Sequence, residues 1–562
     1  MPWAGAVLSA VLLDLPFPVA GPMPAWRGLI AFVALAPLIW AVLAEEKLTS
    51  GAKAPNQSND GNAGAEAPAY HLLRRAFLIG YLCGVLWYAG NCYWIYDTMQ
   101  IHGGVSPTGS MGILLLFSLV LGGYFGLFGL GARFVAQKVG IGAALLAAPF
   151  FWTAIDLVAA RVTSVPWDQL GYSQVDNALL AQFAQTTGVY GITFVLVGVN
   201  AMVVHWIVAP MSRKRYAVVP IMLIIAMSAQ RWAAAPARVA TSATAVLMQP
   251  NLDVESAGAW PGPLWDQQIS QFTGFATRNC GSAMNGVPET GAAAGQSCGQ
   301  PSLVAWPESP APYYEDEDRF REAMKGLALR SRSPLVIGGV GMGQDAANDA
   351  LYYNSAIVFD ARGNHVGRYD KIHLVPFGEF VPYRELFFFA KKLTRKVGET
   401  SRGTGRPVFR LEDASGQTHR YGIFICYESV FADEVREFAK SGAEVFVNIS
   451  DDGWYGDTSA PWQHLNMARM RAIENRRWIL RDTNNGVTAV IDPWGVVRQS
   501  IPRHSVGALV AQYGFNSETT FYTLHGDVFA WVCAILSVGM IVWVMNLRGS
   551  PKVSVKSGLR AK

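Results

Sequence analysis

The sequence predicts two parts of different fold class: a bundle of eight membrane-spanning helices and an α/β domain inserted before the last helix. The composition is 51% hydrophobic and only 15% charged over 562 residues, far from that of an average soluble protein. Apolar runs of membrane-spanning length lie on both sides of a region in which short apolar runs alternate with polar stretches. We therefore expect a membrane part at 1–238, an α/β domain at 239–518 and a last span with a basic tail at 519–562.

The membrane part rests on apolar runs close to the roughly 20 residues that a helix needs to cross a bilayer. The first run is the least regular, because Asp14 and several prolines interrupt it. Buried core helices of a soluble protein would not account for so many long runs. The eight predicted spans lie at 4–20, 28–44, 76–96, 110–132, 141–160, 187–208, 216–234 and 526–546.

Lysine and arginine are shared unevenly between the loops that join these spans. The loops after spans two, four and six and the C-terminal tail are basic, whereas the alternate loops hold only Arg27 and Arg161. The positive-inside rule then places the basic loops and both termini in the cytoplasm, and the α/β domain on the other side. A net charge of +4 is small for this length and does not indicate a nucleic-acid partner.

The α/β domain is predicted from continuous apolar runs, which suit strands buried on both faces. The runs between them that read as helices are 315–332, 430–441 and 462–477. About 270 residues are enough for an independent core. The predicted strands lie at 244–249, 302–306, 335–339, 355–359, 422–426, 444–449 and 487–491.

The segment 254–300 ends in a Gly- and Ala-rich stretch and is expected to form a mobile surface loop. It contains Cys280 and Cys298, on the side of the membrane where oxidising conditions favour disulfides. We predict a bridge between them, with two free thiols as the alternative. No C-x-x-C pair occurs, and His365, His373 and His464 lack a metal-ligand spacing, so they are interpreted as loop or capping residues. No metal and no cofactor is expected.

Cys426 ends the apolar run GIFIC and precedes a helical stretch, which places it at a strand-to-helix turn. Backbone N–H groups and the positive end of a helix lower the pKa of a thiol at such a turn and favour the thiolate nucleophile. Taken alone, a cysteine is more often a buried structural residue. The surrounding motifs favour the catalytic interpretation.

Glu308 and Lys371 are the candidate partners of this thiol. Glu308 follows the buried run SLVAW, where a partly desolvated carboxylate can act as general base; the alternative is a helix N-cap. Lys371 lies in YDKIHLVPFGEFVP, whose prolines and glycine indicate a fixed loop. A lysine held there can stabilise the oxyanion of a tetrahedral intermediate, although a lone lysine is more often a surface residue.

In order and spacing, the motifs WPES, YDKIHLVPFGEFVP, ICYES and NISDDGWYGD resemble the nitrilase superfamily. With the flanking spans and PWDQLGYSQVDN at 166–177, the chain is similar to its membrane-embedded branch, the bacterial apolipoprotein N-acyltransferases. The resemblance implies a four-layer α-β-β-α sandwich on an eight-helix bundle in the bacterial inner membrane, with the catalytic domain on the periplasmic side. By the same resemblance, Glu308 is the base, Lys371 the catalytic lysine and Cys426 the nucleophile.

The resemblance also implies roles for residues that the pattern alone does not single out. Glu379 falls on an acidic residue near the active site, and Tyr427 and Glu428 on the pair that follows the nucleophile. Trp454 falls on an aromatic residue in a mobile, lid-like segment, and Trp265 on another in a flexible arm. We expect the first three to support the catalytic residues and the two tryptophans to contact or gate the substrates.

The function that the resemblance implies is transfer of an acyl chain from a phospholipid to a diacylated apolipoprotein. The chain passes through a thioester on Cys426 to the α-amino group of the diacylglyceryl-cysteine. An alternative that uses the same three residues is a membrane-tethered amidase of small amides. A transporter or receptor with an inactive outer domain would place paired charges inside the spans, which hold almost none.

Overall fold

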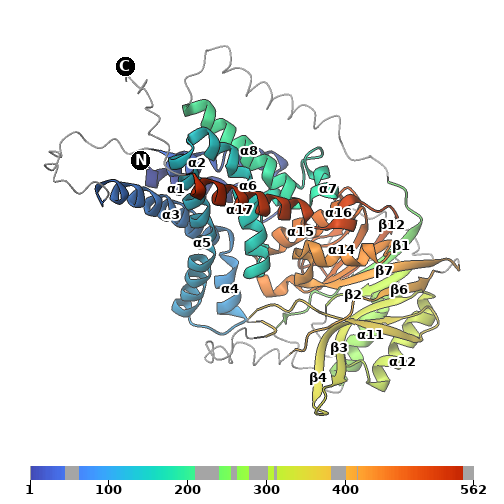
Figure 1. Ribbon diagram of the computed structural model, residues 1–562. Coiled ribbons are helices and arrows are strands. Elements are labelled where there is room, and N and C mark those ends of the chain that lie inside the picture. Colours follow the sequence, from blue (N-terminus) through green and yellow to red (C-terminus); the bar gives the residue numbers. More distant parts are fainter. Residues whose placement is uncertain are drawn as a thin grey trace.

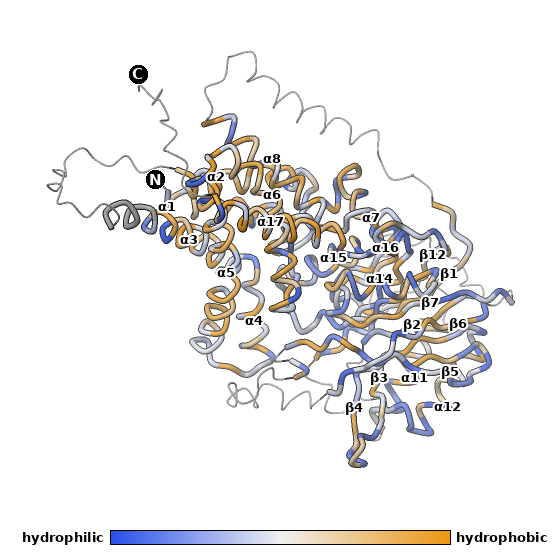
Figure 2. The backbone as a smooth tube through the Cα atoms, in the orientation of Figure 1, coloured by the Kyte–Doolittle hydropathy of each residue, from blue (hydrophilic) through white to orange (hydrophobic). Residues whose placement is uncertain are grey.

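The computed structural model has a helical part and an α/β part that lie side by side (Figure 1). Hydrophobic residues dominate along the helices of the helical part, whereas hydrophilic and hydrophobic residues are mixed along the α/β part (Figure 2). The residues that the structure describes are 2–44, 63–208, 239–254, 263–277, 301–308, 313–376, 378–380, 400–413 and 416–547.

Six candidate spans are present among the described residues, together with the shorter apolar helix α1 (Pro2–Asp14). The predicted first span is therefore a 13-residue helix, and the predicted span 216–234 lies outside the described residues. The six spans are Ala25–Leu43, which ends in α2 (Ala36–Leu43), Tyr70–Asn91 within α3 (Ala63–Asn91), α5 (Pro107–Lys138), α6 (Ile141–Val162), α8 (Val189–Val208) and α17 (Val528–Asn546).

Glycines allow α3 and α5 to pack closely. A Cβ on Gly80 would lie 2.2 Å from the carbonyl oxygen of Phe125, and one on Gly129 would lie 2.4 Å from that of Ala76. Contacts this short exclude any side chain, and small residues are the usual means by which membrane helices approach each other. A larger residue at either glycine would push the two helices apart.

The α/β part consists of two six-stranded sheets. Their strand orders are β12-β1-β2-β3-β4-β5 and β11-β10-β9-β8-β7-β6, with parallel pairing along β1-β2-β3 and β7-β8-β9. The strands are β1 (Ala243–Gln249), β2 (Leu303–Trp306), β3 (Leu335–Gln344), β4 (Ala350–Phe359), β5 (His365–Asp370), β6 (Val408–Glu412), β7 (Thr418–Ile425), β8 (Val445–Ser450), β9 (Trp478–Thr483), β10 (Thr488–Ile491), β11 (Val497–Ile501) and β12 (Gly507–Tyr513).

Helices cover the outer faces of the two sheets, so the domain has four layers. Val246 and Met248 of β1 pack against α11 (Pro263–Thr277) and α12 (Asp318–Ser331), whereas the alternate residue Leu247 joins the core that includes the second sheet. Helices α14 (Ala432–Lys440) and α15 (Ala460–Asn475) pack on the second sheet. The hydroxyl groups of Tyr421 and Tyr513, 2.9 Å apart, join the two sheets.

Two expectations from the sequence are wrong in this domain. The segment 254–300 is not loop throughout, because 263–277 form helix α11. Trp265, Ile269 and Phe272 of this helix are buried, and their spacing of four and three residues gives one apolar helical face. His464 is not a loop or capping residue, since it lies inside α15 and is fully buried. Cys280 and Cys298 lie outside the described residues.

The ends of several strands meet at one place between the sheets. β2 ends just before Glu308, β5 just before Lys371, β7 just before Cys426 and β8 just before Asp451. Side chains from both sheets therefore converge on the same edge, which faces the loop 163–188 of the helical part.

Candidate active site

The nucleophile candidate Cys426 begins the 3-10 helix η6 (Cys426–Val430), directly after β7. It therefore lies at the strand-to-helix turn that the sequence predicted. Its φ of 49° is in the left-handed region, which costs a non-glycine residue about 1–3 kcal/mol. Glu428 accepts a hydrogen bond from the backbone N–H of Ile425 at 2.7 Å, and the ring Nε2 of His464 lies 3.0 Å from the Cys426 carbonyl oxygen. These contacts hold the turn on both sides of Cys426.

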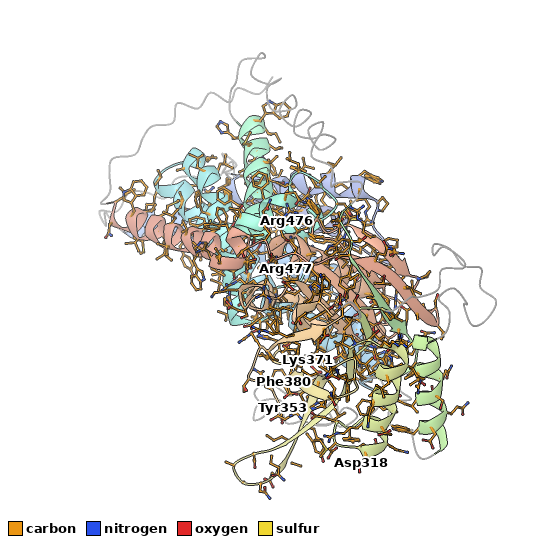
Figure 3. The ribbon with its side chains drawn as sticks, turned by 90° about the vertical axis from the view of Figure 1, so that its right-hand side faces the viewer. Asp318, Tyr353, Lys371, Phe380, Arg476 and Arg477 are labelled. Atoms are coloured by element: carbon orange, nitrogen blue, oxygen red, sulfur yellow. The ribbon has the colours of Figure 1, made fainter. Side chains whose placement is uncertain are left out.

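Lys371 lies between two carboxylates. Its Nζ donates to Glu308 Oε1 at 2.9 Å and to Glu379 Oε1 at 3.0 Å. The lysine side chain is 1% exposed, so these two bonds are made away from bulk water, where charge-assisted hydrogen bonds are strong. Lys371 and Phe380, from the same segment of the chain, are labelled in Figure 3. The structure thus brings together three of the predicted site residues.

Asn354 completes this arrangement and was missed from the sequence. Its Nδ2 donates to Glu308 Oε1 at 2.6 Å and to Glu379 Oε1 at 2.8 Å, the same two oxygens that accept from Lys371. The only signal in the sequence is a polar residue just before an apolar strand run. We name Glu308, Glu379, Asn354 and Lys371 the lysine cluster.

Glu428 ties the loop that carries Lys371 to the nucleophile turn. Besides Ile425 N–H, its carboxylate accepts from the Tyr369 hydroxyl at 2.7 Å, from Ile372 N–H at 2.7 Å and from His373 N–H at 3.1 Å. A single buried side chain thereby fixes the positions of both segments. Glu379 fixes its own loop in a similar way, because its Oε2 accepts from Val375 N–H at 2.8 Å.

The charges of the cluster set the proton positions at rest. Burial alone would lower the pKa of Lys371, but Glu308 and Glu379 outweigh it and raise this pKa well above its usual value. Burial and the Glu308 carboxylate raise the pKa of Cys426 well above that of a free thiol, and Lys371 only partly opposes them. The expected lowering at a helix start is therefore wrong for the resting protein: Cys426 is a thiol beside a base.

The segment after β8 contacts both the base and the helical part. Asp451 N–H donates to Glu308 Oε2 at 2.9 Å. Three residues on, Trp454 packs its ring edge-to-face against His102 at 5.4 Å, and its carbonyl accepts from the Thr98 hydroxyl at 3.0 Å. Trp454 therefore contacts the end of α4 (Trp94–Ile101) rather than the lysine cluster.

The loop 163–188 of the helical part covers the other side of the nucleophile turn. The Tyr427 hydroxyl donates to the Ser164 carbonyl at 3.1 Å, and the Trp167 ring is stacked with the Tyr427 ring at 6.4 Å. Trp167 Nε1 donates to Gln463 Oε1 at 2.9 Å. These contacts hold the candidate site at the boundary between the two parts, and Trp167 belongs to the motif at 166–177.

Trp265 is the predicted site residue that lies apart from the others. On α11, it packs edge-to-face against Tyr313, with the guanidinium of Arg319 4.1 Å from its ring centre. The side chain is buried in the core of the first sheet and its helices.

Two known families match this chain. The carbon-nitrogen hydrolase family matches residues 265–517, the region of the two sheets, and the apolipoprotein N-acyltransferase N-terminal domain matches residues 65–202, within the helical part. Each of the two family matches therefore corresponds to one of the two parts of the fold.

Curated relatives cover most of the chain. An apolipoprotein N-acyltransferase of Geobacter metallireducens is 32% identical over 543 residues, 94% of this chain and 92% of the relative. One of Bradyrhizobium diazoefficiens is 32% identical over 68% of this chain and 70% of its own length. Among solved structures, an amidase from Nesterenkonia sp. is 17% identical with a TM-score of 0.35, covering 53% of this chain and 98% of the amidase. Saccharomyces cerevisiae Nit3, of the nitrilase superfamily, is 16% identical with a TM-score of 0.32, covering 49% and 90%.

Proposed function

Since this chain belongs to the apolipoprotein N-acyltransferase family and is an acyltransferase that N-acylates apolipoprotein, we propose that it works through a thioester on Cys426. The acyl donor is a phospholipid, and the acceptor is the α-amino group of a diacylglyceryl-cysteine. The observation that carries this proposal is the Lys371 ammonium between the Glu308 and Glu379 carboxylates, beside a buried thiol.

In the first step, the Cys426 sulfur attacks the carbonyl carbon of the phospholipid ester while Glu308 takes the thiol proton. The negative charge that develops on the carbonyl oxygen is stabilised by the Lys371 ammonium. When the intermediate collapses, the carbon–oxygen bond to the glycerol breaks and Glu308 gives the proton to the departing oxygen. Lysophospholipid leaves, and the acyl chain remains on Cys426.

In the second step, the neutral amino group of the acceptor attacks the thioester carbon and passes a proton to Glu308. The carbon–sulfur bond then breaks, and Glu308 returns the proton to the sulfur. The products are an amide on the lipoprotein and the free Cys426 thiol. Since Glu308 begins and ends each step as a carboxylate, the lysine cluster needs no cofactor to complete the cycle.

The boundary position of the site supports a lipid substrate pair. Loop 163–188 joins the C-terminal end of α6 to the N-terminal end of α8, and it contacts Tyr427, the residue next to the nucleophile. We propose that the domain faces the periplasm, that both termini are cytoplasmic, and that a bundle of eight spans in the inner membrane carries it. A hydrolase of small amides would not need its nucleophile next to a loop that joins two candidate membrane spans.

The test uses purified full-length protein in detergent with phospholipid and a synthetic diacylated lipopeptide. The proposal predicts a lipopeptide heavier by one amide-linked acyl chain, and one lysophospholipid for each acyl chain transferred. Release of ammonia from small amides without any acylated lipopeptide would instead identify the protein as an amidase.

A further inference from the structure

A second cluster of charged side chains is buried directly against the nucleophile turn. It consists of His464 from α15, Asp452 from the 3-10 helix η7 (Asp452–Tyr455) and Arg481 from β9. All three side chains are fully buried. We name them the histidine cluster. None of the three takes part in the reaction steps above, so their burial next to Cys426 requires another explanation.

The contacts of His464 run from the nucleophile to the charged pair. Its Nε2 lies 3.0 Å from the Cys426 carbonyl oxygen and 2.6 Å from the Ser429 hydroxyl. Its Nδ1 lies 2.9 Å from Asp452 Oδ1 and 3.0 Å from Arg481 Nη2. Arg481 Nη2 also donates to Asp452 Oδ2 at 2.7 Å. The imidazole is thus held on both ring nitrogens.

The proton that matters is the one on Nε2. A carbonyl oxygen can only accept, so the contact with Cys426 is a hydrogen bond when Nε2 carries the proton. Burial and the Arg481 guanidinium lower the pKa of His464, which keeps the ring neutral near pH 7. The two contacts of Nδ1 oppose each other, because Asp452 Oδ1 can only accept and favours a proton on Nδ1, whereas Arg481 can only donate and favours an unprotonated Nδ1. The Cys426 carbonyl oxygen, which can only accept, adds to the effect of Arg481, and together they favour the tautomer with its proton on Nε2.

The backbone at Cys426 needs such a contact. Its φ of 49° is a conformation that a non-glycine residue keeps only where the surroundings hold it. Glu428 fixes the residue before Cys426 through Ile425 N–H, and His464 fixes the carbonyl group of Cys426 itself. Without the second contact, only the short 3-10 helix η6 holds the peptide after Cys426, and the sulfur can shift with it.

We propose that His464 is a positioning residue, whose Nε2–H donates to the Cys426 carbonyl and holds the sulfur between Glu308 and Lys371. The Asp452–Arg481 pair orients the ring, and the stacked Trp167, 6.1 Å from it, links the ring to the helical part. The proposal rests on Cys426 being the nucleophile. His464 itself touches no reacting atom.

The charged groups that face the Cys426 thiol come from three elements. Glu308 follows β2, Lys371 follows β5 and Asp452 begins η7; Lys371 lowers the pKa of the thiol, whereas the two carboxylates raise it. A sulfur that moves away from Lys371 loses the positive charge that favours the thiolate, a larger effect than that of the Ser450 hydrogen bond, which also lowers the pKa of the thiol. The pH dependence of Cys426 reactivity therefore reports its position, which a general loss of stability would not shift.

The test compares His464→Asn with His464→Gln in full-length protein. An asparagine amide occupies the place of Nδ1 and keeps the Asp452–Arg481 side, but it does not reach the Cys426 carbonyl. A glutamine amide places an N–H group near the position of Nε2. Alkylation of Cys426 by iodoacetamide is followed from pH 6 to 10 by peptide mass spectrometry, and single-turnover acylation of Cys426 by phospholipid is measured in parallel.

We expect His464→Asn to shift the alkylation profile to higher pH and to slow acylation about 10- to 100-fold, the range for one lost hydrogen bond. The acylation rate of His464→Gln should stay within about threefold of the wild-type rate. Ser429→Ala, which keeps the Nε2–carbonyl contact, is the matched control and should keep the wild-type profile. The alkylation arm needs no phospholipid, so a wrong acyl donor would leave this test intact.

The positioning role is contradicted if His464→Asn keeps the wild-type profile, or if His464→Gln is as impaired as His464→Asn. If His464→Asn does not accumulate as folded protein, His464→Gln decides alone. A wild-type alkylation profile and acylation rate then support the proposal, and a profile shifted to higher pH overturns it.

Discussion

The lysine cluster and the histidine cluster are both buried beside Cys426, and they differ in charge balance. The lysine cluster has two carboxylates, Glu308 and Glu379, for the one ammonium of Lys371. The histidine cluster has one carboxylate, Asp452, for one guanidinium, with a neutral ring between them. The first therefore has a carboxylate in excess that can accept a proton, and the second has none.

This difference separates chemistry from support. Burial and the Glu308 carboxylate raise the pKa of the Cys426 thiol, and the same carboxylate can accept the proton of the thiol. In the histidine cluster, the Arg481 guanidinium holds the pKa of Asp452 well below its usual range, against the effect of burial, so the charge of Asp452 is fixed. A buried pair with a fixed charge can hold a turn but cannot relay protons. Substitutions in the lysine cluster should therefore slow the chemical step itself, whereas substitutions in the histidine cluster should change the position of Cys426.

The largest effect is expected for Glu308→Gln, which removes the base and leaves Lys371 with a single carboxylate. The rate of Cys426 acylation should fall about 10²- to 10⁴-fold, the usual contribution of a general base. Single-turnover mass spectrometry measures this rate. A variant that acylated Cys426 as fast as the wild type would remove Glu308 from the mechanism.

Lys371→Met should have the second-largest effect. Turnover should fall about 10²- to 10³-fold if the ammonium stabilises the oxyanion as a single hydrogen-bond donor does. The hydrophobic side chain also leaves Glu308 and Glu379 facing each other without a cation. Turnover with the diacylated lipopeptide is the measurement, with circular dichroism to confirm the fold. Near-normal turnover would show that the electrostatic assignment is wrong.

Glu379→Gln should lower turnover less than Glu308→Gln or Lys371→Met does, on the order of tenfold. The reason is that Glu308 still holds Lys371 through its own hydrogen bond. The glutamine can keep the acceptor for Val375 N–H and so preserve the loop. The comparison of this variant with Lys371→Met in the same turnover assay tests the order. A loss larger than that of Lys371→Met would make Glu379 a principal residue rather than a supporting one.

The smallest effect concerns stability at Asp451. Burial and the nearby Glu308 raise the pKa of Asp451 to about 7, above its value of about 4 in the unfolded chain. The folded state therefore gains stability from the protonated form below pH 4 and loses it as the pH rises through 7. Asp451→Asn, which cannot ionise, should raise the unfolding temperature relative to the wild type more at pH 8 than at pH 5, because only part of this stability is lost at pH 5. Thermal unfolding at the two pH values checks this, and an equal difference at both would contradict it.

The motifs predicted the lysine cluster better than they predicted the histidine cluster. Glu308, Lys371 and Cys426 each follow an apolar strand or lie in a Pro-rich loop, so their local sequence indicates a strand end. Asn354 gives no such signal, since its importance comes from contacts with residues 25 and 46 positions away. His464 was misread because a lone histidine on a helix has no local pattern that reveals burial.

The same physical reason explains the strands that the sequence did not predict. β9 contains the buried residues Arg481 and Asp482, and β11 is partly exposed at a sheet edge, so neither is a continuous apolar run. β12 lies far along the chain from its partner β1, so its pairing is set by tertiary contacts. Local apolar runs identify strands in a hydrophobic core, but not those that carry the buried charges beside Cys426.

The most direct test of the central claim is the intact mass of the protein after incubation with phospholipid alone. Without an acceptor amine the thioester is not cleaved by the second step, so the wild type should gain the mass of one acyl chain. Hydroxylamine, which cleaves thioesters, should remove this mass, and peptide mapping should place it on Cys426. Cys426→Ala should remain unmodified. An acyl adduct on Cys426→Ala, or acylated lipopeptide made by a wild type that never carries the adduct, would contradict the account.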